Sequence, residues 1–279
     1  MVYYDNIRIQ GELAMKRAYS QPYDHDCHIH QMLEICVIVE HSAVYRFNSV
    51  DYEANPGDVF ICKPFDAHWI FSKDPRRPCQ YILIYFEPSI VNKVPQGNLL
   101  LTPFYMTDRE PRIPASSRFA QEAARAAMTS VQEREAGLAT WKSRQFMHLI
   151  NMLSYLYEYT MEHDSELEAI EEGLISAIHY FVAQSNDSID IEEAVRLSGL
   201  SRTKFFRCFR IVTGLSPHQF LTRTRLQAAA HAIIHSSQSI LNISMEAGFS
   251  SLSTFNKRFV NHFGLAPREY RKQYQPLRG

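Results

Sequence analysis

The feature that most constrains this chain of 279 residues is an internal repeat near its C-terminus. Six positions match at an offset of fifty, five by identity and one by an aromatic residue, and each copy includes a glycine and a proline. Such a repeat predicts that one small supersecondary unit is present twice. The first copy contains Phe205, Phe209, Gly214, Leu215, Pro217 and Phe220, and the second contains Phe255, Phe259, Gly264, Leu265, Pro267 and Tyr270.

The first copy has the pattern of two short helices joined by a glycine turn. We expect one helix over residues 191–198, a turn at Gly199, and a second helix that Ser201 caps and Gly214 ends. Helical spacing turns three apolar residues of the second helix inward and leaves a basic outer face, which is the plan of a helix-turn-helix. The inward residues are Phe205, Phe209 and Val212, and the outward ones are Arg202, Thr203, Phe206, Arg207 and Arg210.

The second copy repeats this plan, with helices expected over residues 243–247 and 251–263 around another glycine turn. Between the copies, Ser216 and Pro217 open a long helix that runs through Ile234. A continuous helix there would fix the separation of the two units. A separation of about 34 Å would let both units enter the major groove on one face of DNA.

The charge distribution supports a nucleic-acid partner for this region. Residues 176–279 carry 13 Lys and Arg against 6 Asp and Glu, whereas residues 1–175 carry 16 against 24. Lys and Arg neutralise phosphates, and Arg, Asn and Ser can read base edges. A helical bundle with a solvated basic face would explain a single such unit. The duplication together with the charge favours binding to double-stranded DNA.

These C-terminal motifs, from Gly199 to Arg271, resemble the signature of the AraC/XylS family of transcriptional regulators. The resemblance implies sequence-specific DNA binding, usually transcriptional activation, contact with RNA polymerase and a homodimer. Val195 and Ser244 depart from the small alanine usual in the family, so the helix spacing within each unit is expected to differ slightly. The DNA-binding residues implied are Arg202, Thr203, Phe206 and Arg207 in the first unit, and Leu252, Ser253, Asn256 and Lys257 in the second.

The N-terminal part has the pattern of a β domain. Residues 33–39, 44–47 and 81–86 are rich in β-branched and aromatic residues, and turn signals separate them, which suggests a β-sandwich or barrel. The full expectation is an α+β multidomain chain whose second domain is all-α, with two helix-turn-helix units joined by a linker helix. We place a cupin-like β-barrel (jelly roll) sensor at 1–110, a dimerisation helical hairpin broken at Gly137 at 115–162, a linker at 163–172, and the DNA-binding domain at 173–279.

A histidine motif in the β domain resembles the cupin arrangement. His28, His30 and Glu34 lie at even offsets, so they share one face of a regular strand, and His68 follows from a later segment. Three interpretations fit: a pocket for an organic effector, a site for Fe, Mn, Ni or Zn, or structural histidines. We assign no resident cofactor, and a divalent metal, if bound, would use these four residues. The expected effector pocket, for a small molecule such as a carbohydrate, comprises His28, His30, Glu34, Tyr45, His68 and Trp69.

Other functions fit the sequence less well. A metal-dependent cupin enzyme fused to a DNA-binding module is the alternative, but no acid-base set beyond the His and Glu residues is visible. A DNA-repair methyl acceptor needs a Pro-Cys-His-Arg setting, which none of the five cysteines has. The sequence has no apolar run long enough to span a membrane, no signal-peptide pattern and no Cys-x-x-Cys motif. We therefore expect a non-enzymatic, soluble, cytoplasmic regulator.

Overall fold

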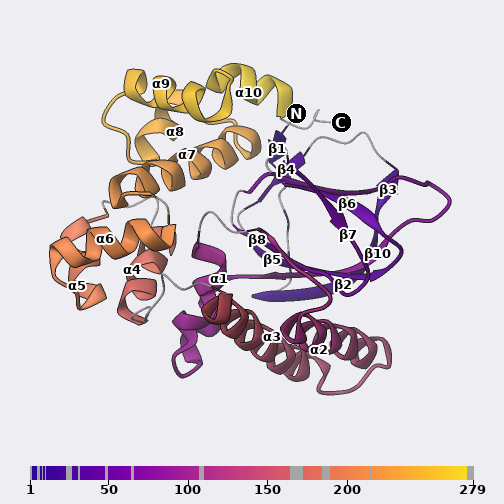
Figure 1. The fold of residues 1–279 in the computed structure, drawn as a ribbon. Helices are drawn as coiled ribbons and strands as arrows, with labels where there is room; N and C mark the ends of the chain where they lie inside the picture. Colours follow the sequence, from indigo (N-terminus) through magenta and orange to yellow (C-terminus); the bar gives the residue numbers. More distant parts are fainter. Residues whose placement is uncertain are drawn as a thin grey trace. The chain divides into compact units, whose positions relative to one another are not determined.

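The computed structural model describes residues 2–4, 7, 9, 11–22, 27–30, 32–47, 50–63, 66–106, 110–163, 172–183, 189–213 and 215–274. The chain divides into two compact units, residues 1–170 and 171–279, and each is described by itself (Figure 1). Residues 164–171, which hold most of the expected linker, lie outside the described residues. Gly214, the expected helix-ending glycine, does so as well.

The first unit is built on two sheets that face each other (Figure 1). Within the described residues no strand pairing joins the two sheets into a closed barrel, so the jelly roll takes the form of a sandwich. One sheet has the order β1 (Val2–Tyr4), β4 (Cys27–Ile29), β9 (His68–Ser72), β6 (Ala43–Phe47) and β7 (Val50–Ala54), with β3 (Gln21–Pro22) also paired to β9. The other has the order β11 (Arg112–Ile113), β8 (Val59–Cys62), β5 (Leu33–Glu40), β10 (Gln80–Phe86) and β2 (Leu13–Tyr19).

The five-stranded sheet is covered on both faces, which explains why its central strands are apolar without alternation. Strand β5 is buried from Leu33 to Ile38. Its inner face joins the core between the sheets, where Cys36 packs with Tyr45 and Phe60. The outer face lies under helix α2 (Arg118–Glu135), and the Arg134 Nη1 atom donates to the Met15 carbonyl oxygen at 2.8 Å.

Helix α2 and helix α3 (Trp141–His163) form a hairpin beneath this sheet (Figure 1). Ser117 caps α2 by accepting from the Phe119 amide, and Gly137 makes the turn at a φ of 68°. Three short helices precede the hairpin. The sequence analysis did not predict these three helices, because each has only one or two turns. They are η1 (Pro88–Lys93), η2 (Gly97–Leu101) and α1 (Thr102–Tyr105).

The second unit is helical in all its described elements. Helix α4 (Glu172–Ala183), which the sequence analysis did not predict, places the buried Phe181 ring 5.4 Å from Phe209 and 6.1 Å from Phe220. The remaining helices are α5 (Ile191–Ser198), α6 (Arg202–Thr213), α7 (Pro217–His235), α8 (Ile240–Glu246), α9 (Leu252–Phe263) and α10 (Pro267–Tyr274). Throughout the described part of the chain, the helices are too short or too polar to span a membrane.

Helix boundaries in this unit follow their caps. Ser216 and Gln219 form a reciprocal capping box at the start of α7, as the Ser-Pro pair suggested. Helix α8 begins at Ile240, three residues earlier than expected, because the Ser239 side chain accepts from the Asn242 amide and caps an extra turn.

Candidate functional site

Helices α5 and α6 form the first helix-turn-helix. The Asp190 side chain caps α5 by accepting from the Glu192 amide at 2.9 Å, and Gly199 ends α5 at a φ of 68°, a conformation that favours glycine. On α6, Phe205 and Phe209 are fully buried, with ring centroids 5.3 Å apart. The remaining face of α6 is therefore turned away from the core.

On that outer face of α6 the polar residues are exposed, and Phe206 is half-buried. The exposed residues are Arg202, Thr203, Arg207 and Arg210. Arg202 forms an ion pair with Glu192 of α5, and its guanidinium lies 5.0 Å from the centre of the Phe206 ring. Arg207 has no hydrogen bond or ion pair with any described residue. Arg207, like the exposed Arg210, is thus a cation on this face that is left available to a ligand.

Helices α8 and α9 form the second helix-turn-helix. Ser251 caps α9, and Phe255 and Phe259 are fully buried at a ring separation of 5.3 Å, as in the first copy. Outside, Ser253 and Lys257 are exposed, while Leu252 and Asn256 are half-buried. Lys257, fifty positions after Arg207, likewise lacks a polar partner in the described part of the chain.

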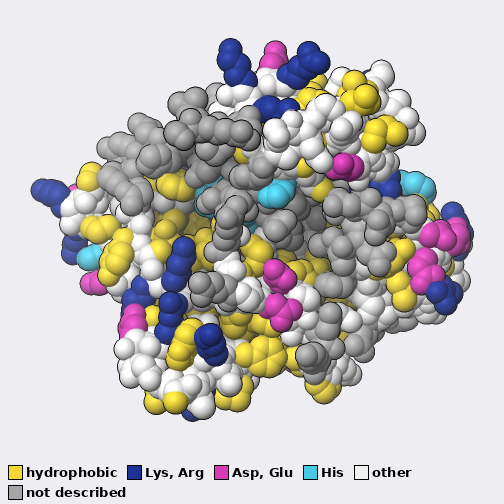
Figure 2. Space-filling view, turned by 180° about the vertical axis from the view of Figure 1, so that it is seen from behind, with side chains coloured by type: hydrophobic (Ala, Val, Ile, Leu, Met, Phe, Trp, Pro, Cys, Tyr) yellow, Lys and Arg dark blue, Asp and Glu magenta, His cyan; other side chains and the backbone are white. Residues whose placement is uncertain are grey.

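Two arginines that the sequence analysis did not assign hold the second helix-turn-helix to α7. The Arg225 Nη1 atom donates to the Gly248 carbonyl oxygen at 3.1 Å, and the Arg258 Nη1 atom donates to the Thr222 hydroxyl at 2.7 Å. The bond from Arg258 to Thr222 positions α9 on α7. Figure 2 shows further Lys and Arg side chains projecting over α9 and α10, at the top of the view.

The two departures from the family pattern are accommodated locally. Ser244 is fully buried, and its hydroxyl donates to the Leu241 carbonyl oxygen at 2.7 Å, so its polar group is satisfied. Val195 is half-buried, and the neighbouring Ala194 is the fully buried residue of α5. A small residue therefore still lies at the buried face of α5.

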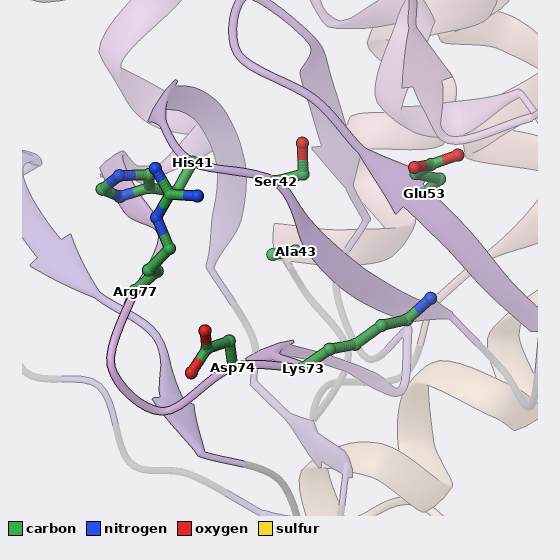
Figure 3. A pocket seen from close by; sticks show the side chains of 7 residues that line it. All are labelled: His41, Ser42, Ala43, Glu53, Lys73, Asp74 and Arg77. Atoms are coloured by element: carbon green, nitrogen blue, oxygen red, sulfur yellow. The ribbon is translucent and has the colours of Figure 1, made fainter.

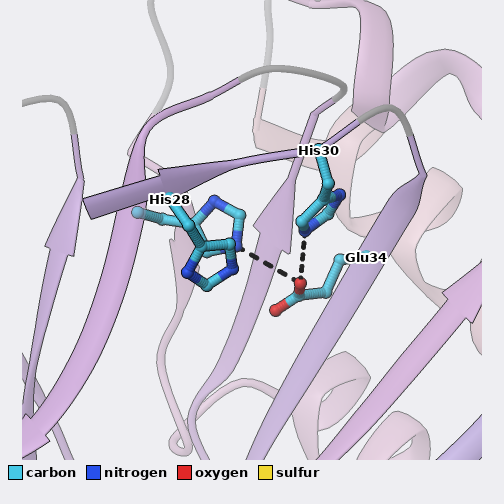
Figure 4. A group of neighbouring side chains, drawn as sticks. His28, His30 and Glu34 are labelled. Carbon is cyan, nitrogen blue, oxygen red and sulfur yellow. Dashed lines mark hydrogen bonds and ion pairs between the residues drawn. The ribbon is translucent and has the colours of Figure 1, made fainter. Parts of the chain in front are cut away.

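The histidine motif of the first unit assembles between the two sheets (Figure 4). His28 on β4 is the register partner of His68 on β9, and their ring centroids are 4.4 Å apart. Glu34 comes from β5 of the opposite sheet, and His30 directly follows β4. One ligand atom from each of these four residues lies within 4.8 Å of the others. We call these four residues the histidine cluster.

The Glu34 carboxylate is the centre of the histidine cluster. Its Oε2 atom lies 2.8 Å from His30 Nε2 and 3.3 Å from His68 Nε2, and its Oε1 atom accepts from the Tyr45 hydroxyl at 3.2 Å. Both the carboxylate and the two rings are almost entirely buried. The Tyr45 hydroxyl donates to this carboxylate, whereas His30 and His68 stabilise its charge only when their Nε2 atoms carry a proton or another cation.

The pKa values in the cluster follow from burial and from this carboxylate. Burial, followed by the neighbouring His68, holds the pKa of His28 well below its usual value, so its ring is neutral at pH 7. Burial opposes ionisation of Glu34, but the charge of His68 and the hydrogen bonds from His30 and His68 lower the pKa of Glu34 well below its usual value. Burial also disfavours the charged form of His68, yet Glu34 outweighs it and raises the pKa of His68.

The other two expected pocket residues differ in exposure. Tyr45 belongs to the core, stacked on Phe60 at 4.4 Å, and it acts on Glu34 through its hydroxyl. Trp69 is half-buried, and its ring meets the His28 ring edge-on at 5.6 Å. The sequence analysis could place both near the strands, but only the sheet pairing brings them to the cluster.

A separate surface pocket of about 350 Å³ lies at the turns after β5 and β9 (Figure 3). Side chains of both charge signs surround it, and it includes none of the residues that were expected to bind an effector. It is lined by His41, Ser42, Ala43, Glu53, Lys73, Asp74 and Arg77.

Comparison with known families covers both units. The AraC-like ligand binding domain matches residues 11–140, and a helix-turn-helix domain matches residues 195–273. The chain is an AraC-family transcriptional regulator. The helix-turn-helix unit is thus the DNA-binding part of an AraC-family protein, and the sheet-rich unit is its AraC-like ligand-binding domain.

Curated relatives of this AraC-family chain are regulators as well. The Msm operon regulatory protein of Streptococcus mutans is 24% identical over 85% of this chain and 83% of its own length. The transcriptional activator RhaS of Escherichia coli is 26% identical over 88% and 87%. An uncharacterized HTH-type transcriptional regulator of Haemophilus influenzae is 35% identical, but only over 41% of each chain.

Solved structures support the fold of the AraC-family chain. ToxT of Vibrio cholerae covers 96% of this chain and all of its own, with a TM-score of 0.52 at 12% identity. A second ToxT structure, with an unsaturated fatty acid bound, has a TM-score of 0.53 at 13% identity. At this identity the likeness shows a shared fold.

Proposed function

We propose that this AraC-family regulator reads DNA with eight residues that form four equivalent pairs in the two helix-turn-helix units. The pairs are Arg202 with Leu252, Thr203 with Ser253, Phe206 with Asn256, and Arg207 with Lys257. The observation that carries the proposal is the last pair. The same position of α6 and α9 presents an exposed cation that has no polar partner in the described structure.

The roles within this set differ. Arg207 and Lys257 can each reach guanine O6 and N7 or a phosphate. Arg202 is held by Glu192 and Phe206, so it contributes charge close to the backbone more than base reading. Phe206 lies partly against neighbours, with its ring 6.3 Å from His218, and offers its remaining edge to a thymine methyl group.

We further propose that an effector bound in the first unit changes which DNA sites the second unit occupies. We also propose that the regulator is a cytoplasmic homodimer that activates transcription together with RNA polymerase. Exposed apolar side chains on the helical hairpin, including Leu138 and Met147, support the hairpin as the dimer contact, and hydrophobic surface is visible over it at the bottom of Figure 2. No enzymatic activity is proposed, because the full-length curated relatives are regulators.

Carbohydrates are the first effector class to screen, and the fatty acid bound to ToxT makes unsaturated fatty acids the second. The effector would contact the histidine cluster, Tyr45 and Trp69. The screen follows the DNA experiment, since the readout is a change in affinity for the selected site.

The test is selection of bound fragments from random DNA by the full chain at physiological salt. We expect a motif with two blocks about one helical turn apart, one for each unit. The matched control is a chain that carries both Arg207→Ala and Lys257→Ala, which should enrich neither block. Enrichment of the same motif by this double variant, or no motif from the wild type in the presence or absence of effector candidates, would contradict the proposal.

A further inference from the structure

Two rings of the histidine cluster each lie between two hydrogen-bond acceptors. The Nδ1 atom of His30 is 3.1 Å from the Met32 carbonyl oxygen, and its Nε2 atom is 2.8 Å from Glu34 Oε2. The Nδ1 atom of His68 is 2.8 Å from the Asp66 carbonyl oxygen, and its Nε2 atom is 3.3 Å from the same carboxylate oxygen. The two rings therefore have the same arrangement, although they come from different parts of the chain.

This arrangement conflicts with neutral imidazoles that have only protein partners. A neutral ring carries one N–H, and a carbonyl oxygen can only accept. With the proton on either nitrogen, the lone pair of the other nitrogen faces an acceptor: the Glu34 carboxylate when Nδ1 is protonated, or the backbone carbonyl when Nε2 is protonated. A second proton on one ring leaves the other ring in this conflict, and a second proton on both rings places two positive rings 5.0 Å apart in a buried site.

A cation shared by the Nε2 atoms and the carboxylate removes the conflict. Histidines that bind metals commonly donate the other N–H to a backbone carbonyl, which fixes the tautomer. His30 and His68 both show this second contact. Protein nitrogen and oxygen ligands lie about 2.0–2.2 Å from a bound zinc ion, so ligands of one ion are at most about 4.4 Å apart. The four atoms, all within 4.8 Å, need to move only by tenths of an ångström.

We propose that the histidine cluster, His28, His30, Glu34 and His68, binds one divalent transition-metal ion. Three imidazoles and one carboxylate suit Zn²⁺, Ni²⁺, Fe²⁺ or Mn²⁺ rather than Ca²⁺ or Mg²⁺, which prefer oxygen ligands. His28 contributes the third nitrogen, since strand pairing holds it opposite His68. Tyr45, which donates to the other carboxylate oxygen, orients Glu34.

The ion would cross-link the sandwich. His28 and His68 belong to strands of one sheet, and Glu34 belongs to β5 of the other. Strand β5 in turn packs against α2, the first helix of the hairpin. Metal binding would therefore stabilise the ligand-binding domain. Through β5 and α2, it would also affect the position of the helices proposed as the dimer contact. This role adds to the proposed function, but metal binding itself can be measured without DNA or effector.

The experiment is metal analysis of the full chain, purified without a histidine tag and stripped with a chelator, followed by titration with each metal salt alone. We expect about one equivalent to bind, and the unfolding temperature of the first unit to rise by several degrees. Titration with Co²⁺ adds a spectroscopic signature, its visible ligand-field bands. Because Trp69 lies 5.6 Å from His28, Co²⁺ should also quench its fluorescence, and Trp69→Phe should lose that quenching.

Glu34→Gln and His68→Gln should weaken metal binding by more than about 100-fold, since they remove direct ligands whereas loss of a supporting residue costs about 10–100-fold. His41→Gln, on the turn after β5, is the matched control and should bind as the wild type does. If the buried variants fail to fold by circular dichroism, the half-buried His28→Gln replaces them. Absence of stoichiometric metal in the wild type, or undiminished binding by the folded variants, would overturn the proposal.

Discussion

Gly248→Ala offers a sharp test of how the second helix-turn-helix is held to α7. Gly248 has a φ of 78°, and a Cβ atom there would lie 2.8 Å from the Arg225 Cζ atom. Gly199, the turn residue of the first unit, has a φ of 68°, but a Cβ atom there would meet nothing within 4 Å. The two glycines thus share the backbone conformation and differ in the guanidinium next to one of them.

The expected costs follow from this difference. A left-handed backbone costs an L-residue about 1–2 kcal/mol, which is the whole loss of unfolding free energy that we expect for Gly199→Ala. Gly248→Ala also displaces the guanidinium, which breaks the bond from Arg225 to the Gly248 carbonyl oxygen. A hydrogen bond of a charged group contributes about 1.5–3 kcal/mol, and half-burial of Arg225 favours the lower end. Gly248→Ala should therefore cost about 2.5–4 kcal/mol in total.

The assay is urea unfolding of the full chain, with amide hydrogen exchange followed in peptides from α8 and α9. Both tryptophans, Trp69 and Trp141, lie in the first unit, so their fluorescence reports separately that this unit is unchanged. In an Arg225→Ala background, the cost of Gly248→Ala should fall to about that of Gly199→Ala, at 1–2 kcal/mol. Equal costs for the two glycine variants with Arg225 present would refute the reasoning.

Three further predictions concern the core, the DNA face and the dimer. Phe259→Ala should lower the unfolding free energy of the second helix-turn-helix by about 3–5 kcal/mol in urea unfolding, because the ring is fully buried. Val260→Ala, at an exposed position, should change this free energy by less than about 0.5 kcal/mol. Similar losses for the two variants would mean that the faces of α9 are wrongly assigned. Arg207→Ala or Lys257→Ala should cost about 1–3 kcal/mol on the selected DNA site and little on random DNA, and equal losses on both DNAs in binding titrations would make these residues phosphate contacts. Met147→Glu should shift the chain toward monomer in sedimentation, because it places a charge on an exposed apolar surface of the hairpin, and an unchanged dimer would place the contact elsewhere.

The sequence by itself determined the identity of the C-terminal unit. Two copies of a Phe-x-x-x-Phe face, each with a preceding glycine turn and a capping serine, specify a helix-turn-helix through local rules alone. Helical spacing decides which side is buried, and the described structure follows it at Phe205, Phe209, Phe255 and Phe259. The sequence analysis missed the extra turn of α8. It also missed α4, although Leu174, Ile175, Ile178 and Phe181 recur at helical spacing and are buried on one face.

Only the tertiary structure decided how the histidine motif is arranged. Spacing puts His28, His30 and Glu34 within seven residues, but the sandwich assigns them to opposite sheets and brings in His68 from forty residues away. The carbonyl contacts that orient the His30 and His68 rings likewise depend on loop backbone positions. Helix capping and burial are local and periodic, so the sequence displays them, whereas strand pairing and ring orientation depend on long-range packing and appear only in the folded chain.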